Sequence, residues 1–157
     1  MIDNFNELIS NSKTVAISGH IRPDGDCVGS CMAVYNYIVT YFPEVEVHVY
    51  LDPIPNIFKF LKNTDKIEDI HTLAEDTVFD LYIALDCSEG SRLGDACAFF
   101  EKAAHTVCMD HHLTNGGFAE YSYIIPDDSS TCELIYNQFG KDKITKDIAE
   151  CLYLGIR

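Results

Sequence analysis

Three short apolar runs, each leading into a side chain that can bind a metal ion, constrain the fold of this chain most strongly. The runs lie at 14–18, 81–85 and 106–109. The first leads into His20, the second ends at Asp86, and the third leads into Asp110. Segments with helical spacing of apolar residues separate the runs. Strands that alternate with helices predict a three-layer α/β/α fold with a mainly parallel sheet.

The rest of the pattern supplies the helices and two further strands. Helices are predicted at 4–11, 27–42, 57–61, 93–104, 131–139 and 145–153. The additional strands are predicted at 45–51 and 121–125. Ligands of open parallel sheets bind outside the carboxyl ends of the strands, and the three polar groups fall at such ends. We therefore expect them to meet at one edge of the sheet.

The first polar group has the composition of a metal-binding loop. Asp24 and Asp26 flank Gly25, so that a turn can aim both carboxylates into the same space. His20 lies four residues before Asp24, at the end of the first strand. Taken alone, an Asp-x-Asp pair is more often a turn or a helix cap than a metal site. The pair gains weight because the other two strand ends carry matching side chains.

Those other strand ends complete the predicted metal centre. Asp86 lies on a strand between the other two groups, which suits a ligand that bridges two ions. His111 adds an imidazole from the third strand end. Histidine and carboxylate hold Mn²⁺, Mg²⁺ or Zn²⁺ while leaving positions open for water, and two ions about 3.5 to 4 Å apart can activate water and clamp phosphoryl oxygens. The residues predict a metallohydrolase acting on phosphate esters, with His20, Asp24, Asp26, Asp86 and His111 as ligands.

Candidate substrate contacts are less sharply defined. Arg22 lies inside the first ligand loop and is the stronger phosphate-binding candidate, whereas a surface salt bridge explains Arg92 equally well. The run 127–130 reads first as an N-cap for the following helix and alternatively as a helix N-terminus that meets a phosphate. Cys27 and Cys87 read as packing residues. Three histidines on strand or loop positions without acidic neighbours are assigned no function: His48, His71 and His105.

Size and charge limit the possible partners. The 157 residues are one domain's length, and 25 acidic against 11 basic side chains give a formal net charge of -14. This balance argues against long duplex nucleic acid, although bound cations would reverse the local sign for a small phosphorylated substrate. No apolar stretch approaches the roughly 18 to 20 residues of a membrane helix, and no signal peptide is recognisable. The 7 cysteines form no C-x-x-C pair and read as reduced thiols, which predicts a cytoplasmic protein.

In order and spacing, these residues resemble the DHH phosphoesterase superfamily, named for the Asp-His-His that stands here at 110–112. The matching segments are 20–30, 85–94, 110–112 and 129–133, and the resemblance extends over essentially the whole chain. Within the superfamily the chain is most similar to the branch of nanoRNases and 3′-phosphoadenosine 5′-phosphate phosphatases.

The resemblance implies two Mn²⁺ ions, with Mg²⁺ as the alternative. It assigns one ion to His20, Asp24 and Asp86, and the other to Asp26, Asp86 and His111. It also implies catalytic roles for His112, at the scissile phosphate or the leaving group, and for Asp110, which would orient an imidazole. Members of the superfamily carry a further metal-ligand aspartate just after the segment that stands here at 152–156, and then a C-terminal substrate-binding domain. We therefore expect residues 1–157 to be a DHH catalytic domain that is truncated before its last metal-ligand motif. We expect this truncated domain alone to have weak activity or none.

The function that follows is a Mn²⁺-dependent phosphoesterase acting on short oligonucleotides, on nucleoside 3′,5′-bisphosphates, or on both. Within the superfamily, a cyclic-dinucleotide phosphodiesterase and an inorganic pyrophosphatase are the alternatives. A metal- or nucleotide-binding module without catalytic activity is the alternative from a different class. No membrane partner is expected. The protein can form an oligomer either through the present domain or through the C-terminal domain that the resemblance implies.

Overall fold

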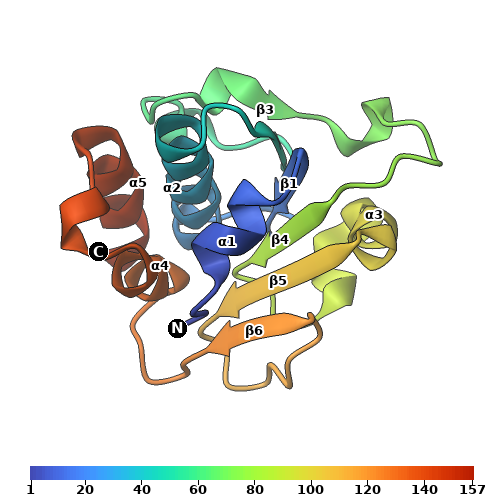
Figure 1. Cartoon of the computed structure of the whole chain (residues 1–157). Coiled ribbons are helices and arrows are strands. Elements are labelled where there is room, and N and C mark those ends of the chain that lie inside the picture. The colour runs from blue at the N-terminus through green and yellow to red at the C-terminus, as the bar shows by residue number, and fades with distance from the viewer.

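A parallel sheet of 6 strands runs through the middle of the protein, in the order β3-β2-β1-β4-β5-β6. The structure is a computed structural model that describes residues 1–157 (Figure 1). The strands are β1 (Thr14–Ser18), β2 (Glu46–Tyr50), β3 (Ile67–Glu68), β4 (Leu81–Leu85), β5 (His105–Asp110) and β6 (Tyr121–Ile124). All neighbouring strands pair in parallel. The chain builds outward from β1 to β3 and then returns to the other side of β1 with β4, so the switch point of the sheet lies between β1 and β4.

Helices cover both faces of the sheet, which confirms the predicted three-layer architecture. One face carries α1 (Phe5–Ser10), α2 (Gly25–Tyr41), α4 (Thr131–Phe139) and α5 (Lys146–Ile156), as Figure 1 shows. The other face carries η4 (Gly90–Ala96) and α3 (Cys97–Lys102). The short 3₁₀ turns are η1 (Asn56–Phe58), η2 (Thr64–Lys66), η3 (Ile70–Thr72) and η5 (Lys141–Lys143). None of the helices combines the length and apolar character needed to cross a membrane.

The central strands are apolar on both sides because both sides are covered. Along β4, Leu81, Ile83 and Leu85 pack into the larger core beneath α2. Tyr82 and Ala84 point the opposite way into the smaller core beneath α3. All of these side chains are fully buried. The continuous apolar runs in the sequence are therefore those of parallel strands sandwiched between helices.

Close packing of α2, α4 and α5 fixes the helix that carries part of the candidate site. A Cβ atom at Gly29 would lie 2.5 Å from the carbonyl oxygen of Cys151, so the backbones of α2 and α5 are in near contact. A Cβ atom at Gly155 would lie 2.3 Å from Cys132 Sγ and 2.8 Å from Asp26 Oδ1. Only glycine fits between these groups, and the first turn of α2 is thereby held against the N-terminus of α4.

Three features differ from the sequence-based prediction. The short helix predicted at 57–61 is only the 3₁₀ turn η1. The continuous helix predicted over 93–104 is wrong, because the segment is broken into η4 and α3 at Gly94, whose φ is 61°. A side chain at Gly94 would collide with Ile21, since its Cβ would lie 2.6 Å from Ile21 Cγ2. Strand β3 was not predicted, and at 2 residues it is too short to show a periodic pattern.

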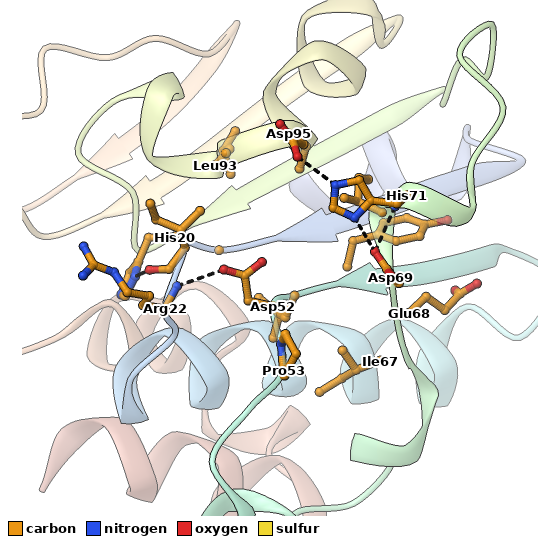
Figure 2. A pocket seen from close by; sticks show the side chains of 17 residues that line it. His20, Arg22, Asp52, Pro53, Ile67, Glu68, Asp69, His71, Leu93 and Asp95 are labelled. Carbon is orange, nitrogen blue, oxygen red and sulfur yellow. Dashed lines mark hydrogen bonds and ion pairs between the residues drawn. The ribbon is translucent and has the colours of Figure 1, made fainter.

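The sheet edge that holds the strand carboxyl ends also borders a large cavity of about 640 Å³ (Figure 2). Its walls come from the segments that follow β1, β2 and β3 and from η4. His20 and Arg22 stand at one end of this outer cavity, and His71 and Asp95 stand at the other (Figure 2).

Candidate metal centre

The loop after β1 and the first turn of α2 place the first group of predicted ligands. Asp24 caps α2, and its carboxylate accepts a hydrogen bond from Cys27 N at 3.1 Å. His20 is anchored through Nδ1, which lies 2.7 Å from the carbonyl oxygen of Ile21. Because a carbonyl can only accept, Nδ1 carries the hydrogen and Nε2 is free to bind a cation. This Nε2 lies 3.6 Å from Asp24 Oδ1 and 3.4 Å from Asp86 Oδ2.

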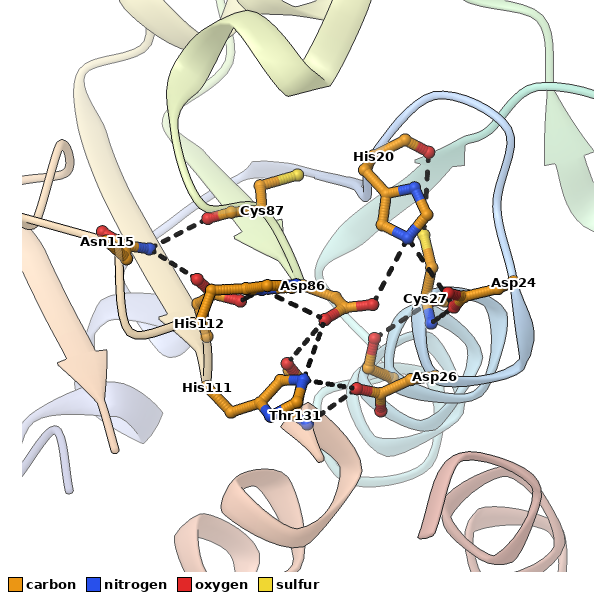
Figure 3. A network of polar contacts seen from close by, with 12 residues as sticks. His20, Asp24, Asp26, Cys27, Asp86, Cys87, His111, His112, Asn115 and Thr131 are labelled. Atoms are coloured by element: carbon orange, nitrogen blue, oxygen red, sulfur yellow. Dashed lines mark hydrogen bonds and ion pairs between the residues drawn. The ribbon is translucent and has the colours of Figure 1, made fainter. Parts of the chain in front are cut away.

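Asp86 occupies the centre of the site, at the end of β4. Its φ of 57° lies in the left-handed region, a strained conformation for an aspartate that costs on the order of 1 to 3 kcal/mol and is found mainly at functional sites. The carboxylate is buried and turns one oxygen towards each side of the pocket (Figure 3). Oδ2 faces His20, whereas Oδ1 lies 3.8 Å from His111 Nε2. Thr131 Oγ1 donates a hydrogen bond to Oδ1 at 3.1 Å. This is the placement expected of a ligand shared by two ions.

The loop after β5 contributes the Asp-His-His group. His111 Nε2 lies 3.6 Å from Asp26 Oδ2, which brings the third strand end to the first. His112 Nδ1 lies 2.6 Å from Oδ1 of the fully buried Asp110 and 3.9 Å from Asp86 Oδ1. The structure thus gathers all of the predicted ligands, together with His112, around a pocket of about 170 Å³. The residues that line it are His20, Asp24, Asp26, Asp86, Ser88, Arg92, His111 and His112.

The N-terminus of α4 orients one of the predicted ligands. Ser130 caps this helix and accepts a hydrogen bond from Glu133 N at 3.2 Å, as the capping interpretation of 127–130 predicted. The next two amides, Thr131 N and Cys132 N, donate to the Asp26 carboxylate at 2.8 and 3.0 Å. The helix N-terminus therefore fixes both oxygens of a predicted ligand, an interaction that the sequence pattern did not reveal.

Two groups in the pocket have displaced pKa values. The neighbouring Asp86 carboxylate raises the pKa of His20 to about 9, against the opposing effect of burial. Burial and the nearby charge of Asp86 raise the pKa of Asp26 to about 6, although the amides of Thr131 and Cys132 work in the opposite direction. Without a cation, the pocket therefore holds protons that a divalent ion would displace.

The donor set fits a divalent cation. Two ligands bound to one ion at about 2.1 Å are separated by roughly 3 to 3.5 Å at octahedral or tetrahedral angles. The His20–Asp86 separation of 3.4 Å and the His111–Asp26 separation of 3.6 Å are close to this spacing. Cys27 Sγ also lies near His20 and Asp86. A hydrogen bond with Cys31 and burial raise the pKa of the Cys27 thiol well above its usual range, which agrees with a packing role.

The two candidate arginines occupy different cavities. Arg92 lines the metal pocket, whereas Arg22 lines the outer cavity and uses its backbone N–H to donate to Asp52 Oδ2 at 3.1 Å. Arg92 is brought to the pocket by η4, and its carbonyl oxygen accepts a hydrogen bond from Ile21 N at 2.9 Å. Both arginines were candidates from the sequence, and Arg22 was favoured, whereas the structure brings Arg92, which follows Asp86 within the same loop, to the metal pocket.

The expectation that three histidines lack acidic neighbours was wrong. His48 lies 2.8 Å from Glu46 and also contacts Glu68, His71 lies 2.7 Å from both Asp69 and Asp95, and His105 lies 2.9 Å from Glu120. Some of these carboxylates are two residues away along a strand or turn, and others come from different segments. None of the three histidines lines the metal pocket.

Together, the fold and the site define an α/β protein that presents a candidate metal centre at the switch point of a parallel sheet. Residues 14–156 match the DHH family, N-terminal domain, and the chain belongs to this family. The assignment agrees with the resemblance seen in the sequence.

Proteins similar to this chain include two curated bacterial relatives. The chain is 26% identical over 153 residues to the bifunctional oligoribonuclease and PAP phosphatase NrnA of Bacillus subtilis (strain 168), covering 94% of this chain and 46% of the relative. It is 27% identical over 145 residues to the probable bifunctional oligoribonuclease and PAP phosphatase NrnA of Streptococcus mutans, covering 91% and 44%. The chain thus spans about half the length of these relatives.

A solved structure shares the fold. The crystal structure of an exopolyphosphatase-related protein from Bacteroides fragilis aligns with a TM-score of 0.88 at 24% identity. The alignment covers 99% of this chain and 48% of that chain. At this identity, the likeness confirms the α/β/α architecture.

Proposed function

We propose that this chain is the metal-binding part of a Mn²⁺-dependent phosphoesterase that hydrolyses short oligonucleotides, nucleoside 3′,5′-bisphosphates, or both. The observation that carries the proposal is the position of Asp86, whose oxygens face His20 on one side and His111 on the other. The names of the relatives from B. subtilis and S. mutans support the substrate class. The unpaired, mostly buried cysteines are in keeping with a cytoplasmic setting.

The geometry supports the following assignment of ligands. One ion would be held by His20, Asp24 and Asp86, and the other by Asp26, Asp86 and His111. When bound, a pair of divalent cations activates water for attack on phosphorus and neutralises the phosphoryl oxygens. In this assignment the ligand side chains hold their positions through backbone contacts, namely the Asp24 cap, the α4 amides on Asp26 and the Ile21 carbonyl on His20.

Two further side chains would act on the substrate. Arg92 lines the pocket and can form two hydrogen bonds with a phosphoryl group, while Arg22 would contact a part of the substrate that extends into the outer cavity. His112, carrying a hydrogen on each ring nitrogen, would donate from Nε2 to the scissile phosphate or give that Nε2 proton to the leaving oxygen as the phosphorus–oxygen bond breaks. Asp110 would stabilise the charge of that imidazole through the Nδ1 hydrogen bond.

We also propose that residues 1–157 are the DHH domain of a longer enzyme. The chain covers 46% and 44% of the two curated relatives, and a C-terminal substrate-binding domain would supply the rest of the substrate pocket. A further metal-ligand aspartate would follow the present segment. On this proposal, turnover requires the longer protein, while the present chain retains metal binding.

The deciding experiment measures release of mononucleotide from a labelled dinucleotide, with Mn²⁺ and then with EDTA. It compares this chain, a version extended with a C-terminal substrate-binding domain, and the extended version carrying Asp86→Ala. We expect turnover by the extended form that both EDTA and Asp86→Ala abolish. Nucleoside bisphosphate, pyrophosphate and a cyclic dinucleotide serve as parallel substrates. Mn²⁺ binding without turnover of any of them would overturn the enzymatic proposal in favour of a binding module.

A further inference from the structure

Asn115 is a buried polar side chain in the loop after β5, and the proposed reaction does not use it. Its Nδ2 donates hydrogen bonds to Asp110 Oδ2 at 2.8 Å and to the carbonyl oxygen of Cys87 at 2.9 Å. Its Oδ1 accepts a hydrogen bond from Gly117 N at 2.8 Å. Figure 3 shows this amide between the segment that follows Asp86 and the Asp-His-His group. One side chain therefore joins two of the strand ends that build the candidate metal centre.

The orientation of the Asp110 carboxylate depends on Asn115. Asp110 is fully buried, and a buried carboxylate must receive hydrogen bonds to offset the loss of water. Asp110 Oδ1 accepts from His112 Nδ1 at 2.6 Å, and Oδ2 accepts from Asn115 Nδ2. Asp110 forms an ion pair with His112 through Oδ1. Its second oxygen, Oδ2, is held by Asn115, which is a neutral donor. The plane of the carboxylate, and hence the direction of Oδ1, follows from these two contacts.

The direction of Oδ1 decides which face and which nitrogen His112 offers to the pocket. With the Nδ1 hydrogen held by Asp110, Nε2 is the nitrogen left to take up a proton and pass it to a substrate oxygen. We infer that Asn115 is a positioning residue, which holds Asp110 so that His112 keeps its Nδ1–H tautomer and leaves Nε2 without a hydrogen-bond partner in the protein. The tautomer is a property of the folded chain, whereas its effect on turnover rests on the function proposed above.

A conservative exchange isolates the two donated hydrogen bonds. In Asn115→Asp the side chain keeps its size and its acceptor for Gly117 N, but it replaces the amide donor with a carboxyl group, so that at most one of the two donated hydrogen bonds survives, through a proton shared with Asp110. The matched control is Asn36→Asp, the same exchange at a buried amide of α2 whose Nδ2 donates to the carbonyl of Lys62 at 3.2 Å. Asn36 makes no hydrogen bond to a residue of the metal pocket.

The readout is the imidazole ¹⁵N spectrum of the chain without metal, at a pH where the His112 ring is neutral, with His112→Gln used for assignment. We expect the Nδ1–H tautomer in the wild type and in Asn36→Asp, and a shift towards Nε2–H in Asn115→Asp. Where Asn115→Asp does not fold, Asn115→Ser takes its place as a smaller variant that loses the amide donor. An unchanged tautomer in the folded variant, or failure of both variants to fold, would overturn the inference.

Turnover by the extended enzyme gives the second readout. We expect Asn115→Asp to lower kcat by roughly 10- to 100-fold, the range typical of groups that orient a reactive imidazole. KM and Mn²⁺ affinity should change by less than about 2-fold, because Asn115 contacts none of the predicted metal ligands. A shifted tautomer in a protein that hydrolyses none of the substrates would support the positioning role while the proposed function fails.

Discussion

Two cavities along one edge of the sheet contain similar side chains in different arrangements. In the metal pocket, histidine nitrogens and carboxylate oxygens of the predicted ligands are separated by 3.4 to 3.8 Å. In the outer cavity, His71 lies 2.7 Å from both Asp69 and Asp95. The contacts of His71 in the outer cavity are completed hydrogen bonds. The nitrogen–oxygen distances in the metal pocket are longer than a good hydrogen bond and are close to the distance between two ligands of one ion.

Backbone anchoring explains the difference. Asp24, Asp26 and His20 are each fixed by a backbone amide or carbonyl, and they are therefore kept from collapsing onto one another. In the outer cavity Asp69 also accepts a hydrogen bond from a backbone amide, that of His71 at 3.0 Å, but the side chains of His71 and Asp95 are exposed on turns and satisfy each other directly. The number of histidines and carboxylates thus does not identify a metal site; a set of donors that is anchored and held apart does.

The largest difference between the two cavities should appear when one carboxylate is removed from each. Asp86→Ala deletes the group that faces both His20 and His111, and we expect Mn²⁺ affinity to fall by more than about 100-fold. Asp69→Ala removes a partner of His71, and we expect an affinity within about 2-fold of wild type. Titration calorimetry with Mn²⁺ measures both variants. Equal losses would contradict the distinction between the cavities.

A smaller effect should separate the anchoring of Asp26 from its charge. In Asp26→Asn the amide oxygen can still accept from one of the two α4 amides while the NH₂ group faces the other, so we expect Mn²⁺ binding weaker by roughly 10-fold and a Tm between those of the wild type and Asp26→Ala. Asp26→Ala removes the acceptor for both α4 amides, at Thr131 and Cys132, and should cost about a further 0.5 to 2 kcal/mol of stability. Thermal melts and metal titrations of the two variants test this order. Similar Tm values for both would show that the α4 amides do not depend on Asp26.

The pH dependence of stability should follow the groups in the metal pocket. The pKa values of Asp26 and His20 are raised from 3.8 to about 6 and from 6.5 to about 9. A raised pKa gives stability that is present below the ordinary pKa and lost as the pH rises through the raised one. The metal-free chain should therefore lose stability between about pH 4 and 6 through Asp26, and between about pH 6.5 and 9 through His20.

Metal ions should reverse this trend, because they displace the same protons. The increase in Tm caused by saturating Mg²⁺ should therefore grow from pH 6 to pH 9, by several degrees in a domain of this size. Melting curves with and without Mg²⁺ across this pH range provide the measurement. An increment that stays constant with pH would show that protons and metal do not compete at His20.

The sequence was most informative where a ligand directly follows a strand. The strand predicted at 14–18 and the helix predicted at 131–139 have the same bounds in the structure. His20 and Asp86 could be placed because a few residues of chain after a buried strand leave a side chain little choice of position. Parallel strands then bring such ends together without any further information from the side chains.

Contacts between distant segments could not be read from the sequence. The α4 amides reach Asp26 across more than 100 positions of the chain, and Asn115 reaches Cys87 across 28. Periodicity reports which face of an element is buried, and it carries no information about which polar groups will meet in the folded protein. The break at Gly94 escaped prediction for the same reason, since the side chain that excludes a Cβ atom belongs to Ile21.

The smallest effect on Tm and Mn²⁺ affinity is expected when His71, in the outer cavity, is replaced. Hydrogen bonds to Asp95 and Asp69 raise the pKa of His71, so any stability they contribute is present below its ordinary pKa of 6.5 and lost as the pH rises. The groups are exposed and screened by solvent, so His71→Gln should leave Tm nearly unchanged at any pH. Mn²⁺ affinity should also match wild type, because η4 is held to the first ligand loop independently by the hydrogen bond from Ile21 N to the Arg92 carbonyl. A marked loss of affinity in His71→Gln would mean that the two cavities are coupled through η4, and that the outer histidine helps to place Arg92.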